Sequence, residues 1–232
     1  MTQEVLLKEG MPSKKAKIVL INGSLHGDSE NSNTLSLLQV AETELFKRGA
    51  KVTLISPELT EFRAEKSTEN RSMYVLRTQQ ILSALKIADG LIVGTGTYWG
   101  HSGSVLQRFI EETTPTEGTG VWLGKPIGIV VSEHSTGGQA VLANLMLTFS
   151  NLGCLIPPQA GMVFSRLGQE AKKHGAEWAR DIWGLDDVGS ICDKVMAYAS
   201  QRNAVKTQSW PMDSDPDSFH RRWIEPPARS LK

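Results

Sequence analysis

The chain has 232 residues and a mass of 25.4 kDa, and 40% of its residues are hydrophobic. This length predicts one domain with extensions, because single domains commonly hold about 150 residues. The 25 basic and 25 acidic residues balance to a formal net charge of zero. That balance excludes the strong basic excess typical of nucleic-acid-binding proteins and of polybasic membrane anchors.

Cysteines and apolar segments exclude further classes. The two cysteines, Cys154 and Cys192, lie far apart and lack the spacing of a metal site. We therefore expect two buried hydrophobic side chains, no disulfide framework and no metal. No stretch approaches about 18 uninterrupted apolar residues, so no membrane span is expected. Residues 1–15 lack the apolar core of a secretory signal, which predicts a cytoplasmic protein.

Five short apolar runs predict the strands of a parallel sheet. They are apolar throughout rather than alternating, which is typical of strands covered on both faces. The predicted strands are 17–22, 51–55, 91–94, 127–131 and the shortest run, 154–156.

Amphipathic stripes separate these runs. Apolar spacings of three, four and seven predict helices around Leu35–Leu45, Val75–Leu85, Val105–Ile110 and Leu142–Leu152. The alternation predicts an open, doubly wound α/β sheet with right-handed crossovers and helices on both faces. Such a sheet binds its ligand outside the carboxyl ends of its strands, so the loops that follow the strands are the candidate site.

The predicted domain spans residues 16–202, with an extension at each end. Residues 1–15 form a polar N-terminal extension. Beyond Gly168, stripes at Trp178–Leu185 and Ile191–Tyr198 predict two helical pieces, the second capped by Asp186 or Asp187. Residues 203–232 form a Pro- and charge-rich C-terminal arm. We expect the arm to dock on its own domain or on a neighbouring subunit, because it carries Trp210, Phe219, Trp223 and Ile224.

The loop after the first strand brings hydroxyl and amide side chains to the start of a helix. Gly23 lets the chain turn out of the strand, and Ser32, Asn33 and Thr34 stand at the helix N-terminus. Unpaired N–H groups and partial positive charge at a helix N-terminus favour a phosphate. The alternative is that Ser32 or Asn33 is only an N-cap.

The loops after the third and fourth strands are rich in glycine. Residues 94–104 hold four glycines around Tyr98 and Trp99. That pattern favours either a planar ring lying against open backbone or a tight turn whose aromatic side chains cover the end of the sheet. Residues 132–138 end in two glycines, whose N–H groups either approach a ligand or follow a helix cap at Ser135 or Thr136.

Motifs of competing site types are absent. The run from Gly94 to Gly100 lacks the spacing of a dinucleotide fingerprint, and Gly124-Lys125-Pro126 lacks the hydroxyl residue that ends a P-loop. No GxSxG nucleophile elbow is present. Asn22 stands where a receiver domain would place a carboxylate, so phosphoacceptor chemistry is not expected.

Three segments together resemble the flavodoxin-like NAD(P)H-dependent FMN reductase family, which includes quinone and azo reductases. They are GS…SNTL at 23–35, TYWGHSGSVLQRFIEE at 97–112 and GKPIGIVVSEHSTGG at 124–138, within a similarity that covers roughly 16–201. The resemblance implies a flavodoxin-like five-stranded parallel sheet of order 2-1-3-4-5. It also implies FMN as cofactor, NAD(P)H as electron donor, a small-molecule acceptor, and a homodimer or homotetramer.

The resemblance further implies which residues bind FMN. The first loop would hold the phosphate, the second would lie against the isoalloxazine, and the third would approach its pyrimidine side. In chain order these residues are Ser24, His26, Ser32, Asn33, Thr34, Thr97, Tyr98, Trp99, Gly100, His101, Ser135, Thr136, Gly137 and Gly138. The chain departs from the family pattern in a longer first loop, in His26 where arginine is usual, and in Thr97 where proline is usual. These departures predict weaker or pH-sensitive FMN binding, since histidine titrates near neutrality.

These features predict an oxidoreductase that takes hydride from NAD(P)H and passes two electrons to a quinone, free flavin, azo compound or oxygen. One alternative is a one-electron flavodoxin-type carrier, against which the balanced charge argues. A second is a flavin-fold module without catalytic activity, which His26 and the longer first loop motivate. A third is a hydrolase that uses Ser102 or Ser135 with His101 or His134.

Overall fold

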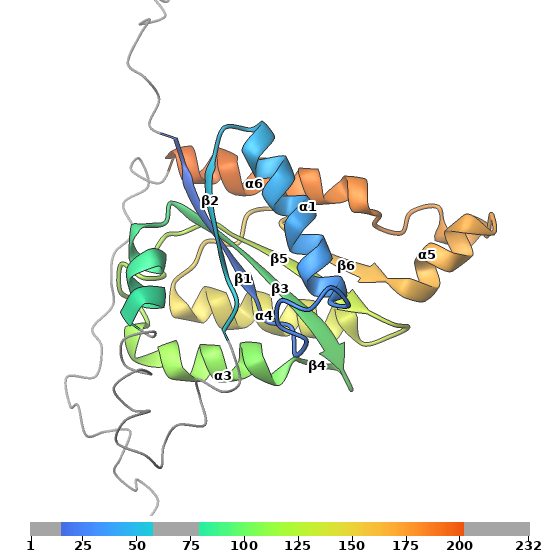
Figure 1. The fold of residues 1–232 in the computed structure, drawn as a ribbon, viewed down its shortest axis with the longest axis horizontal. Coiled ribbons are helices and arrows are strands. Elements are labelled where there is room, and N and C mark those ends of the chain that lie inside the picture. Colours follow the sequence, from blue (N-terminus) through green and yellow to red (C-terminus); the bar gives the residue numbers. More distant parts are fainter. Residues whose placement is uncertain (1–14, 58–78, 202–232) are drawn as a thin grey trace, which may run out of the picture.

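The computed structural model describes residues 15–57 and 79–201. Five parallel strands form its central sheet in the order β2-β1-β3-β5-β6 (Figure 1). Counted without the short antiparallel β4, this is the predicted flavodoxin-like order 2-1-3-4-5, and the fold class is confirmed. The strands are β1 (Lys17–Asn22), β2 (Lys51–Ile55), β3 (Gly90–Tyr98), β4 (His101–Ser102), β5 (Ile127–Glu133) and β6 (Gly161–Ser165).

Helices cover both faces of the sheet (Figure 1). α1 and α6 pack on one face, and α3, α4 and the helical residues 79–87 pack on the other. Within β1, Ile18 and Leu20 belong to the core on the first face, and Val19 and Ile21 to the core on the second. Because both faces are buried, the strand is apolar throughout. The helices are α1 (Asn33–Lys47), α3 (Ser104–Thr113), α4 (Gly138–Leu152), α5 (Arg166–Lys173) and α6 (Val188–Gln201).

The fifth strand does not lie where the sequence predicted it. Residues 154–156 contribute only one isolated bridge, between Pro126 and Leu155. Pro157 and Pro158 follow at once, and proline cannot donate a hydrogen bond to a sheet. The strand begins instead at Gly161, where the residues pair in parallel with β5 from Ile129 onward.

The region between β6 and α6 also differs from the prediction. The stripe at 178–185 is not a helix, because only Glu177–Ala179 and Leu185–Asp187 form short 3-10 turns. Trp178 is 69% exposed, so this aromatic side chain anchors no core. α6 begins at Val188 as expected, but the Asp187 carboxylate accepts from the Gly184 N–H at 2.7 Å, within the turn that precedes the helix.

Several sequence predictions fall outside the described residues. These are the N-terminal extension up to residue 14, the stripe residue Val75, and the C-terminal arm from 203 onward. Both cysteines are buried and free, as predicted. In the two described ranges, no helix is both long enough and apolar enough to cross a membrane.

Candidate functional site

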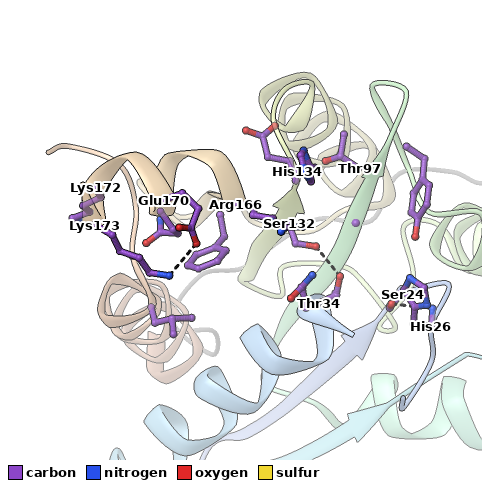
Figure 2. Close-up of a pocket in the computed structure, with 18 of the residues that line it drawn as sticks. Ser24, His26, Thr34, Thr97, Ser132, His134, Arg166, Glu170, Lys172 and Lys173 are labelled. Carbon is purple, nitrogen blue, oxygen red and sulfur yellow. Dashed lines mark hydrogen bonds and ion pairs between the residues drawn. The ribbon is translucent and has the colours of Figure 1, made fainter. Parts of the chain in front are cut away.

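A cleft of about 750 Å³ opens at the carboxyl ends of β1, β3, β5 and β6. This is the edge at which doubly wound sheets bind ligands. Four parts of the chain line it: the loop after β1 with the start of α1, the end of β3, the end of β5, and the segment around α5 (Figure 2).

The loop after β1 is held in place by Asn22. The Asn22 side chain donates from Nδ2 to the Gly27 carbonyl at 2.9 Å, and its Oδ1 accepts from the Ser24 N–H at 3.2 Å. Asn22 is completely buried, so these bonds form away from bulk water and give the loop a defined shape. The residue that stands in place of a receiver carboxylate therefore has a structural role.

Hydroxyl groups cluster where this loop meets α1. Ser32 caps α1, because its Oγ accepts from the Leu35 N–H at 3.2 Å. The same hydroxyl donates to Ser24 Oγ at 2.9 Å, and Ser24 Oγ also accepts from the His26 N–H at 3.1 Å. The capping interpretation of Ser32 is therefore confirmed. Ser32 lies behind the cleft wall, whereas Ser24, His26, Asn33 and Thr34 line the cleft.

The end of β3 forms the second wall. Gly96, Thr97 and Tyr98 line the cleft there. Thr97 Oγ1 is buried and has no hydrogen-bond partner among the described residues. A buried, unpaired hydroxyl costs free energy, and such groups in native structures commonly hydrogen-bond to a ligand or to an ordered water.

The turn between β3 and β4 does not line the cleft. Trp99 adopts a left-handed backbone with φ of 52° and is 99% exposed. Neither it nor Gly100 lines the cleft, and His101 lies at a separate hollow beside α4. The structure thus brings Thr97 and Tyr98 to the first loop but leaves Trp99, Gly100 and His101 outside the cleft.

The third loop packs against the end of β3 and the turn that follows it. Gly137 has a left-handed φ of 95°, and a Cβ added there would lie 3.3 Å from both Gly100 Cα and Thr97 Cγ2. Gly137 is the N-cap of α4, so the alternative that Ser135 or Thr136 caps this helix is wrong. The Gly138 N–H donates to Glu133 Oε2 at 2.7 Å. None of the four predicted residues of this loop lines the cleft.

The residues just before that loop line the cleft instead. They are Ser132, Glu133 and His134 at the end of β5 (Figure 2). Ser132 Oγ lies 3.0 Å from Thr34 Oγ1, so the end of β5 contacts the start of α1. The rule that ligands bind at the carboxyl ends of strands could have identified these residues.

Sequence reasoning missed the fourth wall. It consists of the end of β6, α5 and the turn before α6, and its lining residues are Phe164, Arg166, Gln169, Glu170, Lys172, Lys173, Gly184, Leu185 and Asp186. α5 buries only Gly168, so it has no apolar stripe to detect. Its one local signal is Ser165, whose Oγ accepts from the Gly168 N–H at 3.3 Å as an N-cap.

Comparisons with known proteins agree with this architecture. The chain is 28% identical over 170 residues to a protein named NAD(P)H dehydrogenase (quinone) from Chelativorans sp. (strain BNC1). That match covers 70% of this chain and 80% of the relative. Among solved structures, RosB with a bound 8-demethyl-8-formylriboflavin-5′-phosphate intermediate has a TM-score of 0.60 at 13% identity, covering 90% of this chain and 96% of RosB.

A second solved structure and a family model complete the comparison. The apo form of the NADH:FMN oxidoreductase EMOB has a TM-score of 0.56 at 18% identity, covering 84% of this chain and 92% of EMOB. At these identities both structural likenesses establish the fold. The model of the NADPH-dependent FMN reductase family matches residues 16–168, which is more than half of the chain. The protein therefore belongs to the NADPH-dependent FMN reductase family.

Proposed function

We propose that this protein is an FMN-dependent oxidoreductase that takes hydride from NAD(P)H and passes two electrons to a small acceptor. The observation that carries the proposal is the pairing of two features in one cleft: the hydroxyl cluster at the start of α1 and the unpartnered Thr97 hydroxyl at the end of β3. A quinone, free flavin, azo compound or oxygen would serve as acceptor.

The residues present fit the phosphate of FMN. Ser24, Asn33 and Thr34 offer hydroxyl and amide groups, and the first N–H groups of α1 point out of the helix end. The His26 side chain adds a ring N–H donor to this group. Such a cage binds a phosphate with neutral donors and a helix dipole, so the arginine that is usual in the family is not required.

The end of β3 fits the ring part of the cofactor. Gly96 brings backbone without a side chain to the cleft, beside the Tyr98 ring, whose Cε2 would lie 3.2 Å from a Cβ added at Gly96. Thr97 Oγ1 supplies a hydrogen-bonding group that no described residue uses. When bound, FMN would supply hydride acceptance from a nicotinamide and two-electron delivery to an acceptor. The chain itself binds and orients the reactants, with Tyr98 and His134 at the edges of the same cleft.

An anaerobic reduction tests the proposal. The full chain is loaded with FMN and desalted, and NADPH or NADH is added while the visible flavin band is followed. Retained flavin that bleaches faster than the same concentration of free FMN supports a reductase. Retained flavin that stays oxidised with both donors would overturn the proposal in favour of a flavodoxin-type carrier. Absence of binding, measured by titration, would leave a fold module without catalytic activity.

A further inference from the structure

The α5 wall of the cleft carries a cluster of cations. Arg166, Lys172 and Lys173 all line the cleft, and Figure 2 shows them on the opposite side from Ser24 and His26. α5 contains these three basic residues and a single carboxylate, Glu170. The cleft thus has two ends of different chemistry: neutral donors at α1 and positive charges at α5.

The ion pairs leave part of this positive charge without a carboxylate. Lys173 Nζ contacts Glu170 Oε1 at 3.0 Å, and this bond from Lys173 holds the pKa of Glu170 below its ordinary value. Lys172 Nζ donates to the Ile182 carbonyl at 3.1 Å, which orients the ammonium group but does not neutralise it. Within the described ranges, Arg166 and Lys172 form no ion pair within 4.0 Å, although the charge of Arg166 also helps to lower the pKa of Glu170.

Two other carboxylates, Glu133 and Asp186, line the cleft and add negative charge to it. The Glu133 carboxylate accepts a hydrogen bond from the Gly138 N–H at 2.7 Å. Asp186 stands in the turn before α6, at the same wall as Lys172, and forms no ion pair within the described part of the chain. Asp186 therefore weakens the attraction of this wall for an anion without removing it.

We propose that Arg166 and Lys172 form an anion subsite that binds a phosphate group of the nicotinamide dinucleotide, an inference that rests on the proposed function. The hydroxyl cluster at α1 suits one phosphate, that of FMN, and a dinucleotide brings further phosphoryl groups into the same cleft. A guanidinium binds phosphate through two parallel N–H bonds, and an ammonium adds a compact positive charge. The phosphate is either the 2′-phosphate of NADPH or the pyrophosphate common to both dinucleotides.

Substitution of Arg166 tests the subsite by kinetics. The Arg166 side chain is exposed, so Arg166→Ala leaves the core intact. We expect KM for the donor to rise about ten- to a hundred-fold, the usual effect of removing a charge-assisted pair. A rise for NADPH alone assigns the 2′-phosphate, and an equal rise for NADH and NADPH assigns the pyrophosphate. Arg166→Lys keeps the charge but loses the paired N–H donors of the guanidinium. Its KM for the donor should lie between those of the wild type and Arg166→Ala.

Direct binding gives a readout that does not depend on turnover. Calorimetry of the FMN-loaded protein with adenosine 2′,5′-bisphosphate and with ADP separates the two phosphate sources. Arg166→Ala and Lys172→Ala should each lower the affinity for one of these two ligands. Asp186→Asn should raise the affinity for the same ligand. The matched control is Arg180→Ala, because Arg180 is an exposed arginine that follows α5 but does not line the cleft.

Two results would overturn the subsite. One is unchanged donor KM and unchanged nucleotide affinity in both the Arg166 and Lys172 variants. The other is an effect confined to anionic acceptors, with donor binding intact, which would assign these cations to the acceptor. Failure of the wild-type chain to oxidise either donor would instead contradict the proposed function, so the two failures are distinguishable.

Discussion

The hydroxyl groups of Thr34 and Ser132 lie 3.0 Å apart, although 98 residues separate them in the chain. Thr34 belongs to the first turn of α1, and Ser132 is the penultimate residue of β5, which pairs with β3 on the side opposite β1. This contact connects the hydroxyl cluster at the start of α1 to the end of β5 (Figure 2). The start of α1 and the end of β5 are therefore in direct contact at the cleft.

Replacing Thr34 tests the phosphate cage. Thr34→Val keeps the shape of the side chain and removes its hydroxyl, so FMN should bind about ten-fold more weakly, as expected for one lost bond to a charged group. Equilibrium titration of the apo protein with FMN measures the change. Thr43→Val is the control, because Thr43 is an exposed α1 residue whose hydroxyl donates to the Gln39 carbonyl and to no other described residue. Equal FMN affinity in all three proteins would remove Thr34 from the site.

Replacing Thr97 should have opposite effects on the apo and loaded proteins. Thr97→Val removes a buried hydroxyl that has no partner among the described residues, so the apo protein should gain up to about 1 kcal/mol of stability. The loaded protein should gain less or lose stability, because FMN would lose a bond. Thermal unfolding with and without FMN measures both. A variant less stable than wild type in the apo state would show that this hydroxyl has a structural partner.

Gly94 permits the close approach of α1 to β3. A Cβ added at Gly94 would lie 2.9 Å from Thr34 Cγ2 and 3.0 Å from Leu38 Cδ1. Gly94→Ala should therefore shift α1, lower the free energy of unfolding by about 1–3 kcal/mol and weaken FMN binding. Gly120→Ala is the matched control, because an added Cβ there meets no atom of the described residues within 4 Å. Denaturant unfolding and FMN titration of both variants check the prediction, and equal behaviour would contradict it.

The two buried thiols predict how stability depends on alkaline pH. Burial raises the pKa of Cys154 and of Cys192 to about 12, from an ordinary value of 9.0. The unfolded chain thus releases these protons near pH 9 while the folded chain retains them. Their contribution to stability is therefore complete below pH 9 and is lost as the pH rises toward 12.

A double variant isolates this contribution. Between pH 9 and 12, the free energy of unfolding of the wild type should fall more steeply than that of Cys154→Ala/Cys192→Ala. The difference in slope should reach at most about 1.4 kcal/mol per pH unit for each thiol. Denaturant unfolding at a series of pH values measures both slopes. Parallel curves would show that the thiols titrate alike in the folded and unfolded states.

The strands and most helices could be predicted from the sequence because their signals are local. A strand buried on both faces must be apolar throughout, as β1 is, and a helix that buries one face must repeat its apolar residues, as α4 does with Leu142, Leu145 and Phe149. The fifth strand was misplaced because 154–156 is as apolar as a strand, while the pairing of β6 with β5 depends on a register that no local pattern records.

Lys125 and Trp99 show what only the tertiary structure decided. In sequence, Lys125 follows a glycine like a phosphate-binding lysine, yet its completely buried Nζ donates to the carbonyls of Leu85 and Lys86 at the end of a distant helical segment. Trp99 is 99% exposed and does not line the cleft, and its expected contact with the cofactor stays a prediction. Each outcome depends on contacts, or their absence, between segments far apart in the chain.

The sequence by itself determined the fold class, the family and the two loops that supply Ser24, Thr34, Thr97 and Tyr98 to the cleft. The tertiary structure decided that Ser132 and His134 line the cleft in place of the glycines that follow them, and that α5 closes it with Arg166 and Lys172. The physical reason is that a polar helix at a cleft buries almost nothing. It leaves no hydrophobic period in the sequence, and its position depends on where the chain re-enters the sheet.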